Sequence, residues 1–411
     1  MVGCTRHKPA KCVILILIMP PISKVAYETT ENSNRYYVSG LIMQKKVKIA
    51  NRELIVGEAL AWSIYDPDGN LLLSEGQTIA DKEKLDSLCK HDIFRLVTVS
   101  DDDPNESSPF FRLSEISKRL EKAFDELESA NPTSLAMLES LMMELDILCL
   151  VASNAMLASV HLPQTNTSSV AHAVQCAILC HTLFAKQNMP DADRQNIMAA
   201  ALTANIGMRG FYEQMQKQET PLSATQRRMI AQHPQKSAKM VHDIGVKNAT
   251  WLKVILQHHE LNDGSGYPSS LTKNQIVIGA KALAIAERYS MMISHHSKHE
   301  PISIGDALKV FFMEPGKKYE KALCLHFVLQ LTLFPPGSFV ELANGDTAIV
   351  VSRNMEQPSH PVVKSVADQL GHVFDLPIQR NVSDTEFEIM KLCQFSGVRE
   401  LKLDDIWGYV N

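Results

Sequence analysis

The sequence predicts a mostly α-helical protein with a small α+β module at its N-terminal end and a small β-containing module at its C-terminal end. Three observations lead to this prediction. Apolar residues recur at helical spacing through most of 110–330, strand-like alternation with turn signals occupies about 46–100, and an Asn-Gly pair stands between two apolar runs near residue 345. A chain of 411 residues is also too long for one ordinary core, so two or three domains are expected.

The composition is that of an ordinary globular protein, with 45% hydrophobic and 21% charged residues and a net charge of −5. Lys and Arg are thinly spread, which argues against nucleic-acid binding but not against a small phosphate ligand. The cysteines include no C-x-x-C pair, which favours a reduced, cytoplasmic compartment. Cys176 and Cys180 lie one turn apart on an apolar helix, where buried free thiols are far commoner than a zinc pair.

The first 42 residues imitate a signal peptide, because basic residues precede a short apolar run, Cys12–Met19, that two prolines stop. The run is far shorter than the roughly 20 apolar residues that span a bilayer. No membrane span is therefore expected, and the lack of a clean cleavage site after the run argues against a signal peptide. We expect the natural chain to start at Met43, with residues 1–42 a disordered or absent upstream extension.

Residues 43–105 are predicted to form the N-terminal α+β module. Strand-like runs flank an Asp-Pro-Asp-Gly turn, and a short helix precedes a closing strand. Trp62 and Tyr65 are expected in its core. The expected elements are strands over 60–65 and 71–73, a helix over 81–89 and a strand over 94–99.

An acidic stretch, 101–109, is typical of a linker. Apolar residues then recur at helical spacing, and 133–158 is rich in Leu and Met, so 110–158 is predicted to be a helical connector. Its apolar stripes could be buried between two copies of the chain in a homodimer or against other helices of the same chain, and both alternatives stay open. Residues 335–411 are predicted to form the C-terminal module, with a hairpin that turns at Asn344-Gly345.

Seven of the fifteen histidines lie between 161 and 259, and four of them suggest a site. His172 begins an apolar helix, His233 lies in a helix that opens with a capping box, and His258 and His259 end a third helix. Imidazoles that converge from several helices build metal sites in helical bundles, and they suit zinc, iron, nickel or copper. Each histidine taken alone is more often an ordinary helix-face or surface residue.

Residues 257–268, Gln-His-His-Glu-Leu-Asn-Asp-Gly-Ser-Gly-Tyr-Pro, resemble the signature of the HD-GYP family. The flanking segments agree in order and spacing. Residues 221–234 are similar to the helix that leads to the family's His-Pro, and 278–289 to the helix with its last metal-binding acid. The resemblance implies that 160–334 fold as an HD-type helical bundle.

The resemblance also implies an activity and a metal centre. The family is implicated in hydrolysing the bacterial messenger cyclic di-GMP with a cluster of two or three metals, usually iron, that activates a water. A divalent metal (Fe, Mn or Zn) is therefore a possible cofactor of this chain. The positions that match the family's ligands are His172, His233, His258, His259 and, with a longer side chain than the family's aspartate, Glu287.

The chain departs from the family at its paired His-Asp and the following lysine, where it has Ala204, Asn205 and Met208. Ala204 has no ligand atom, and the neutral amide of Asn205 is a poor bridge between cations. Lys281 stands where an arginine is expected, and Ser290 where a second aspartate is expected. Because neutral imidazoles alone do not offset several cations, we expect at most one metal and no hydrolysis of cyclic di-GMP.

The Gly-Tyr-Pro loop keeps the family's pattern, and its glycines permit tight turns. In the family this loop is associated with contacts to partner proteins, notably GGDEF-type cyclases. The leading hypothesis is a cytoplasmic bacterial regulatory protein that acts through partner or cyclic di-GMP binding. The residues assigned to this ligand or partner loop are Glu260, Asp263, Gly264, Gly266, Tyr267, Pro268 and, from the next helix, Lys281.

Three alternatives remain. The chain is a residual phosphodiesterase with one metal at the five matching positions, the domain is an adaptor that joins two β modules, or the loop only folds the domain. Metal retained after dialysis would favour the enzyme, and loss of partner capture on truncation of 335–411 would favour the adaptor.

Overall fold

The structure is a computed structural model, and it divides into two units, residues 1–107 and 108–411, which we describe separately. In the first unit it describes 25–26, 36–39, 42–48 and parts of 56–98. In the second it describes 108–409 apart from 164–167, 186, 188, 219, 295–300 and 314–315.

The described residues of the first unit form a six-stranded antiparallel sheet in the order β1-β2-β3-β6-β4-β5 and one short helix, in agreement with the α+β prediction. Ile64, Ile79 and Ile93 form its small core. Strands β1 and β2 lie within 1–42, and β3 begins at Ile42. The other residues of that segment, Trp62 and most of the Asp-Pro-Asp-Gly turn lie outside the described residues. The start at Met43 stays a prediction. The elements are β1 (Val25–Ala26), β2 (Tyr36–Ser39), β3 (Ile42–Lys48), β4 (Ile64–Tyr65), β5 (Leu71–Leu73), α1 (Lys82–Leu88) and β6 (Phe94–Thr98).

The second unit begins with a helical hairpin, α2 (Pro109–Glu128) and α3 (Thr133–Val151), followed by α4 (Ser153–His161). One continuous helix was predicted over 133–158, but the backbone leaves the helical region at Ala152 (φ −130°, ψ 42°) and starts again. The apolar stripe of α2 is buried within the chain's own core, beside α3. Intramolecular packing therefore accounts for that stripe.

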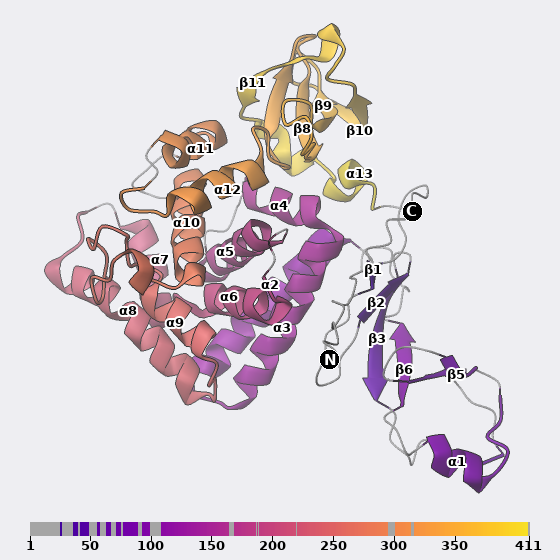
Figure 1. The fold of residues 1–411 in the computed structure, drawn as a ribbon. Coiled ribbons are helices and arrows are strands. Elements are labelled where there is room, and N and C mark those ends of the chain that lie inside the picture. Colours follow the sequence, from indigo (N-terminus) through magenta and orange to yellow (C-terminus); the bar gives the residue numbers. More distant parts are fainter. Residues whose placement is uncertain are drawn as a thin grey trace, which may run out of the picture. The chain divides into compact units, whose positions relative to one another are not determined.

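The helices that follow share one core with this hairpin, so the mostly α prediction is confirmed (Figure 1). Helix α5 lies at its centre, with nearly every residue buried, and contacts both α6 and α10. No helix among the described residues is both long and apolar enough to cross a membrane. The elements are α5 (Ser169–Phe184), α6 (Asp191–Thr203), η2 (Ile206–Met208), α7 (Arg209–Lys217), α8 (Ala224–Asp243), α9 (Ala249–Gln257), η3 (Lys273–Gln275), α10 (Ile278–Ile293), α11 (Ile304–Met313) and α12 (Lys321–Leu331).

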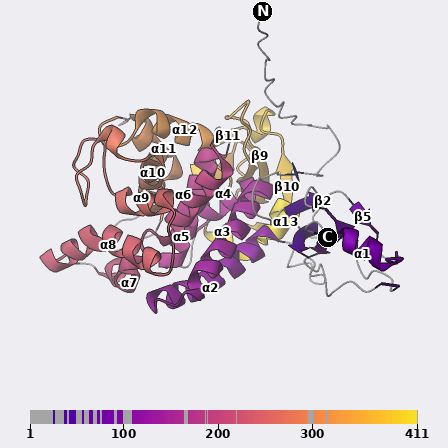
Figure 2. The ribbon, with the colours of Figure 1, turned by 60° about the horizontal axis from the view of Figure 1, so that its bottom comes forward.

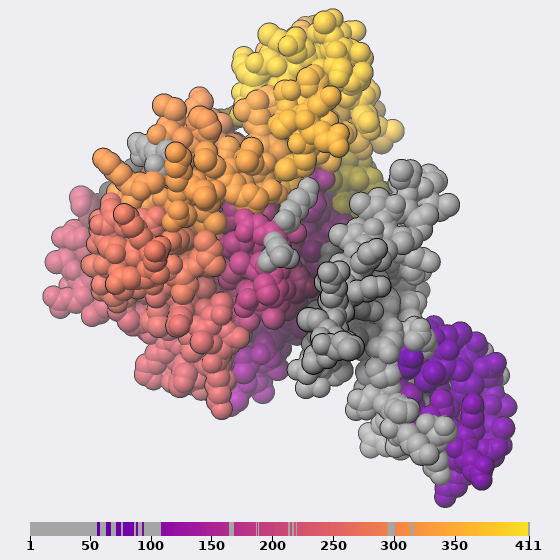
Figure 3. All heavy atoms as spheres, in the orientation of Figure 1, coloured from indigo at the N-terminus to yellow at the C-terminus, as the bar shows by residue number. Residues whose placement is uncertain are grey.

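A five-stranded antiparallel sheet, ordered β10-β9-β8-β7-β11, forms the C-terminal module. Figure 2 shows β9, β10 and β11 of this sheet together with α13. The predicted hairpin is confirmed: Phe339 pairs with Ile349, and Gly345 adopts a positive φ of 89° in the turn. Figure 3 shows this module (yellow) beside α11 and α12 (orange). The elements are β7 (Phe339–Leu342), β8 (Thr347–Ser352), β9 (Val362–Ala367), β10 (Val373–Arg380), η4 (Thr385–Phe387), β11 (Ile389–Cys393), η5 (Ser396–Glu400) and α13 (Leu403–Trp407).

Candidate metal centre

Four helices bring the five predicted ligand residues to one place. His172 lies in the first turn of α5, His233 in the middle of α8, and Glu287 in α10, while His258 and His259 follow directly on α9. The start of α5 is fixed by Ser168, whose side chain accepts a hydrogen bond from the backbone of Ala171. The predicted capping box at the start of α8 is also present.

Glu287 lies at the centre of the cluster. Its Oε1 is 4.0 Å from Nε2 of His172 and 3.8 Å from Nε2 of His258, and its Oε2 is 3.8 Å from Nε2 of His259. His233 joins through its Nε2, which is 3.1 Å from Nε2 of His258. One ring nitrogen from each of His233, His258 and His259 lies within 4.8 Å of the other two, so the predicted ligands do converge.

Backbone carbonyls orient two of these rings. His233 Nδ1 is 2.7 Å from the carbonyl of Ile230, and His258 Nδ1 is 2.6 Å from that of Ile255. A carbonyl can only accept, so each Nδ1 carries the proton and each Nε2 presents a lone pair. Two lone pairs 3.1 Å apart repel unless a proton or a cation lies between them. This donor set therefore fits one divalent transition metal.

Burial keeps the imidazoles neutral. It lowers the pKa of His233 to about 3, with a further contribution from His258, and lowers the pKa of His258 to about 4. The pKa of His259 is also well below its usual value, again mainly through burial. Burial raises the pKa of Glu287, an effect opposed by His172 and by a hydrogen bond from Asn205. Neutral imidazole is the form that binds metals.

Asn205 lies beside the cluster, in the turn between α6 and η2. Its Nδ2 donates to Oε1 of Glu287 at 2.6 Å, and its buried Oδ1 has no hydrogen-bond partner among the described residues. Ala204 is fully buried in the core and offers no ligand atom. Met208 is half-buried at the end of η2. A neutral amide thus touches the carboxylate at the centre of the cluster.

The Gly-Tyr-Pro loop is held against the cluster by its own residues. The buried carboxylate of Glu260 accepts from the backbone of Ser269 at 2.6 Å and of Leu271 at 2.8 Å, and the Tyr267 ring stacks on His259 with centroids 4.6 Å apart. Pro268 follows Tyr267 through a cis peptide bond. Glu260, assigned to the ligand or partner loop, therefore has a structural role.

Two glycines and an acid complete the loop. A Cβ on Gly266 would lie 2.4 Å from the backbone nitrogen of Leu261, so only glycine fits there. Gly264 has a positive φ of 77°. Asp263 accepts from Ser265 within the loop. Outside the loop, the last residue of the predicted set, Lys281, pairs with Glu320 through Nζ at 3.0 Å.

Three residues that the sequence did not predict lie in contact with the cluster or next to it. Tyr212 of α7 stacks on His172, with centroids 5.8 Å apart. Gln175 accepts from Ser290 Oγ at 2.7 Å, and that oxygen is 3.3 Å from His172 Nδ1. Cys176 Sγ is 3.6 Å from Nε2 of His172. The i, i+4 spacing of Cys176 and His172 was the available signal, because it places both on one helix face.

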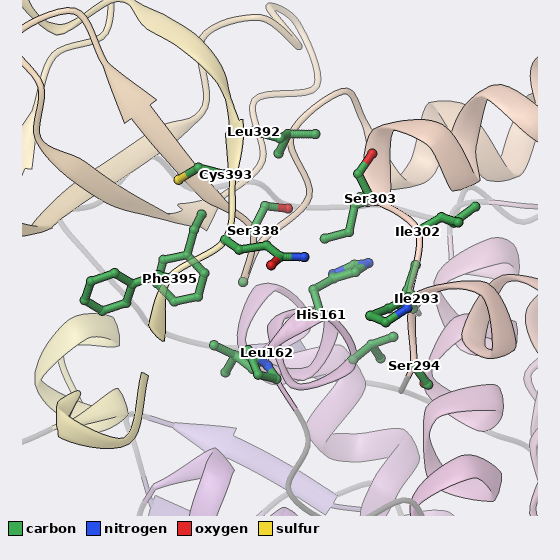
Figure 4. Close-up of a pocket in the computed structure, with 17 residues that line it drawn as sticks. His161, Leu162, Ile293, Ser294, Ile302, Ser303, Ser338, Leu392, Cys393 and Phe395 are labelled. Carbon is green, nitrogen blue, oxygen red and sulfur yellow. The ribbon is translucent and has the colours of Figure 1, made fainter. Parts of the chain in front are cut away.

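A separate cavity of about 350 Å³ lies where the ends of α4 and α10 meet β7 and β11 (Figure 4). Apolar side chains make up most of its wall, and His161, Ser338 and Cys393 contribute polar atoms. His161 Nδ1 donates to the carbonyl of Pro336 at 2.9 Å, and its Nε2 is 2.9 Å from the Tyr289 hydroxyl. None of the predicted metal ligands lines this cavity.

The helical domain is similar in sequence to known proteins. Residues 153–323 match the family model described as HD domain. The chain is 25% identical over 211 residues to a cyclic di-GMP phosphodiesterase of Pseudomonas aeruginosa, covering 51% of each chain. It is 23% identical over 213 residues to cyclic di-GMP phosphodiesterase PdeB of Borreliella burgdorferi, covering 52% of this chain and 56% of the relative.

The chain thus spans about half the length of these two curated relatives. A solved structure described as an HDG"Y"P protein from Bdellovibrio bacteriovorus is 17% identical, with a TM-score of 0.47, and the match covers 69% of this chain and 98% of that one.

Proposed function

We propose that this chain, whose residues 153–323 form an HD domain of the HD-GYP family, takes part in cyclic di-GMP signalling by binding and not by hydrolysis. We also propose that the protein is located in the cytoplasm of a bacterium. One observation carries it: the neutral amide of Asn205, and not a second carboxylate, contacts the central carboxylate of Glu287.

The charge balance supports this proposal. Among the described residues, Glu287 is the only acid in the two groups of close donor atoms at the cluster. Two divalent cations would bring four positive charges against one carboxylate in a buried place, where uncompensated charge is costly. The paired His-Asp of the family corresponds in our proposal to Ala204 and Asn205, and the contact of Asn205 with Glu287 supports that register.

The Gly-Tyr-Pro loop supplies the surface for binding. Residues 263–270 are exposed or half-buried, while Glu260 and His259 hold the loop from beneath. The proposed partner is a GGDEF-type protein or cyclic di-GMP itself.

A second candidate function is a residual one-metal phosphodiesterase, which the convergence of all five predicted ligands favours. His172, His233, His258, His259 and Glu287 would hold the metal, which when bound would polarise a phosphoryl oxygen and lower the pKa of a water. His259 is the most exposed of these ligands, with 28% of its side chain exposed, so substrate would approach from its side, beside Tyr267.

Binding assays on the Tyr267→Ala variant test the proposed function. Calorimetry would measure the affinity of the wild-type chain and the variant for cyclic di-GMP, and pull-down would measure capture of a purified GGDEF-type protein. We expect the wild type to bind one of the two and the variant to bind it at least tenfold more weakly. Equal binding by the variant would exclude the loop as the docking surface. Failure of the wild type to bind either would contradict the proposed function.

A further inference from the structure

We propose that Cys176 is a metal ligand, and that His172, Cys176 and Glu287 form a thiolate-containing site next to the three-histidine group. The proposal needs only that the domain binds a metal ion and is independent of whether cyclic di-GMP is bound or cleaved. It gives a soft donor to a centre whose predicted ligands were nitrogens and one carboxylate.

The three donor atoms have the separations of a metal site. Cys176 Sγ is 3.6 Å from His172 Nε2, and that nitrogen is 4.0 Å from Glu287 Oε1. One ligand atom from each of the three residues lies within 4.8 Å of the other two. With metal–ligand bonds of about 2.0–2.3 Å, tetrahedral ligands lie roughly 3.3 to 3.6 Å apart. Small side-chain movements would therefore close the site around one ion. All three residues are buried.

The tautomer of His172 also supports a metal site at these three residues. The hydroxyl of Ser290 donates its one proton to Oε1 of Gln175 at 2.7 Å, so at 3.3 Å its oxygen accepts from Nδ1 of His172. Nδ1 is then the protonated nitrogen, and Nε2 presents a lone pair towards Cys176 and Glu287. Ser290, at the position where the family has an aspartate, therefore orients a ligand instead of acting as one.

Cys176 also supplies the charge that the cluster lacks. Asn205, at the position where the resemblance expects a carboxylate, is a neutral amide, and Glu287 is the only acid in the two groups of close donor atoms among the described residues. Burial, and then the neighbouring Glu287, raises the pKa of the free Cys176 thiol, but coordination to a metal ion deprotonates a thiol outright. A thiolate together with Glu287 would offset the two positive charges of a single divalent ion, so this site needs no second acid and still leaves no charge for a second ion.

Asn205 offers a fourth donor. Its buried Oδ1 has no hydrogen-bond partner among the residues that the structure describes, while its Nδ2 touches Glu287. A half-turn of the amide exchanges these two atoms and brings the oxygen to the carboxylate, where a shared cation would lie. Four protein donors make a closed site, which is typical of structural rather than catalytic metals, and the thiolate favours zinc or iron.

Cobalt substitution tests the proposal. Thiolate-to-cobalt charge transfer absorbs in the near ultraviolet, whereas nitrogen and oxygen ligands give only visible bands. We expect the cobalt-loaded wild type to show the charge-transfer band, Cys176→Ser to lose it while keeping visible bands from the histidines, and Cys180→Ser to keep it. Cys180 is the matched control, because it is equally buried one turn further along α5.

Three outcomes would overturn the proposal: a charge-transfer band that persists in Cys176→Ser, its absence from the cobalt-loaded wild type, or failure of cobalt to bind. If Cys176→Ser does not fold, as judged by circular dichroism, zinc X-ray absorption of the wild type decides. We expect one sulfur at about 2.3 Å with lighter atoms at about 2.0 Å. A zinc shell without sulfur would refute the thiolate. Neither readout depends on the nucleotide, so this proposal and the proposed function fail separately.

Discussion

Replacing Asn205 by Asp returns to the cluster the carboxylate that the HD-GYP resemblance assigns to this position. The Asn205 amide donates to Glu287 Oε1 at 2.6 Å. With aspartate in its place, two buried carboxyl groups would face each other at that distance. Without a metal they would keep one proton between them, because two like charges so close cannot both ionise. With a metal, both would be ligands.

The size of the effect follows from this contact. A hydrogen bond to a charged group contributes about 1.5–3 kcal/mol. In metal-free protein, Asn205→Asp exchanges this bond for a carboxyl pair that must take up a proton from water at pH 8, which costs a comparable amount. We therefore expect the variant to be about 2 kcal/mol less stable than wild type in chelator at pH 8. The added charge should increase the affinity for Mn²⁺ or Zn²⁺ at least tenfold, which is about 1.4 kcal/mol.

Urea unfolding with chelator and with saturating metal measures both quantities, and metal titration gives the affinity directly. Asn262→Asp is the matched control, because Asn262 is buried, donates to Glu320 at 3.4 Å and lies outside both groups of close donor atoms. It should lose stability without recovery by metal. Unchanged metal affinity and unchanged chelator stability in Asn205→Asp would refute the placement of Asn205 at the metal position.

Three further predictions concern other parts of the domain. Burial lowers the pKa of His161 to about 4 from 6.5, so the unfolded chain takes up the proton first and stability is lost as the pH falls from 6.5 towards 4. His161→Gln should reduce the difference in unfolding free energy between pH 7 and pH 5 by about 2 kcal/mol, and an unchanged difference would contradict this. Gly266→Ala should lower the free energy of unfolding by about 1–3 kcal/mol, because the added Cβ has no space. Gly210→Ala should not lower it, because nothing lies within 4 Å of its added Cβ. Equal melting temperatures of the two variants would argue against a rigid loop. Arg194→Met should cost about 3–5 kcal/mol in urea unfolding, because it leaves the buried carboxylate of Asp146 without its guanidinium partner, and a loss under 1 kcal/mol would refute that estimate.

Local signals predicted the fold well. The capping box at Ser223, the hairpin turn at Gly345 and the helical spacing from Leu113 to Leu127 each depend on residues close in sequence, and the structure confirms all three. The break at Ala152 was not predicted, because neither proline nor glycine marks it. It depends on how α3 and α4 pack on the rest of the core.

The site was predictable only in part. The resemblance predicted five ligand positions, and the structure brings these five side chains together. Spacing alone could not show that Asn205 meets Glu287, since 82 positions separate them. In the sequence, the spacing of Cys176 and Cys180 indicates only ordinary buried thiols, whereas in the structure Cys176 contacts His172 on the same helix face. The cavity at His161 joins segments from four distant parts of the chain, so no local pattern could indicate it.

Metal analysis of the purified protein by mass spectrometry, combined with a cyclic di-GMP hydrolysis assay in added iron or manganese, tests the central claim most directly. We predict no linear product above the protein-free control, even in samples that retain metal. Product that forms in the wild type and disappears in His258→Ala would contradict the account and show that the chain hydrolyses the messenger in spite of Ala204 and Asn205.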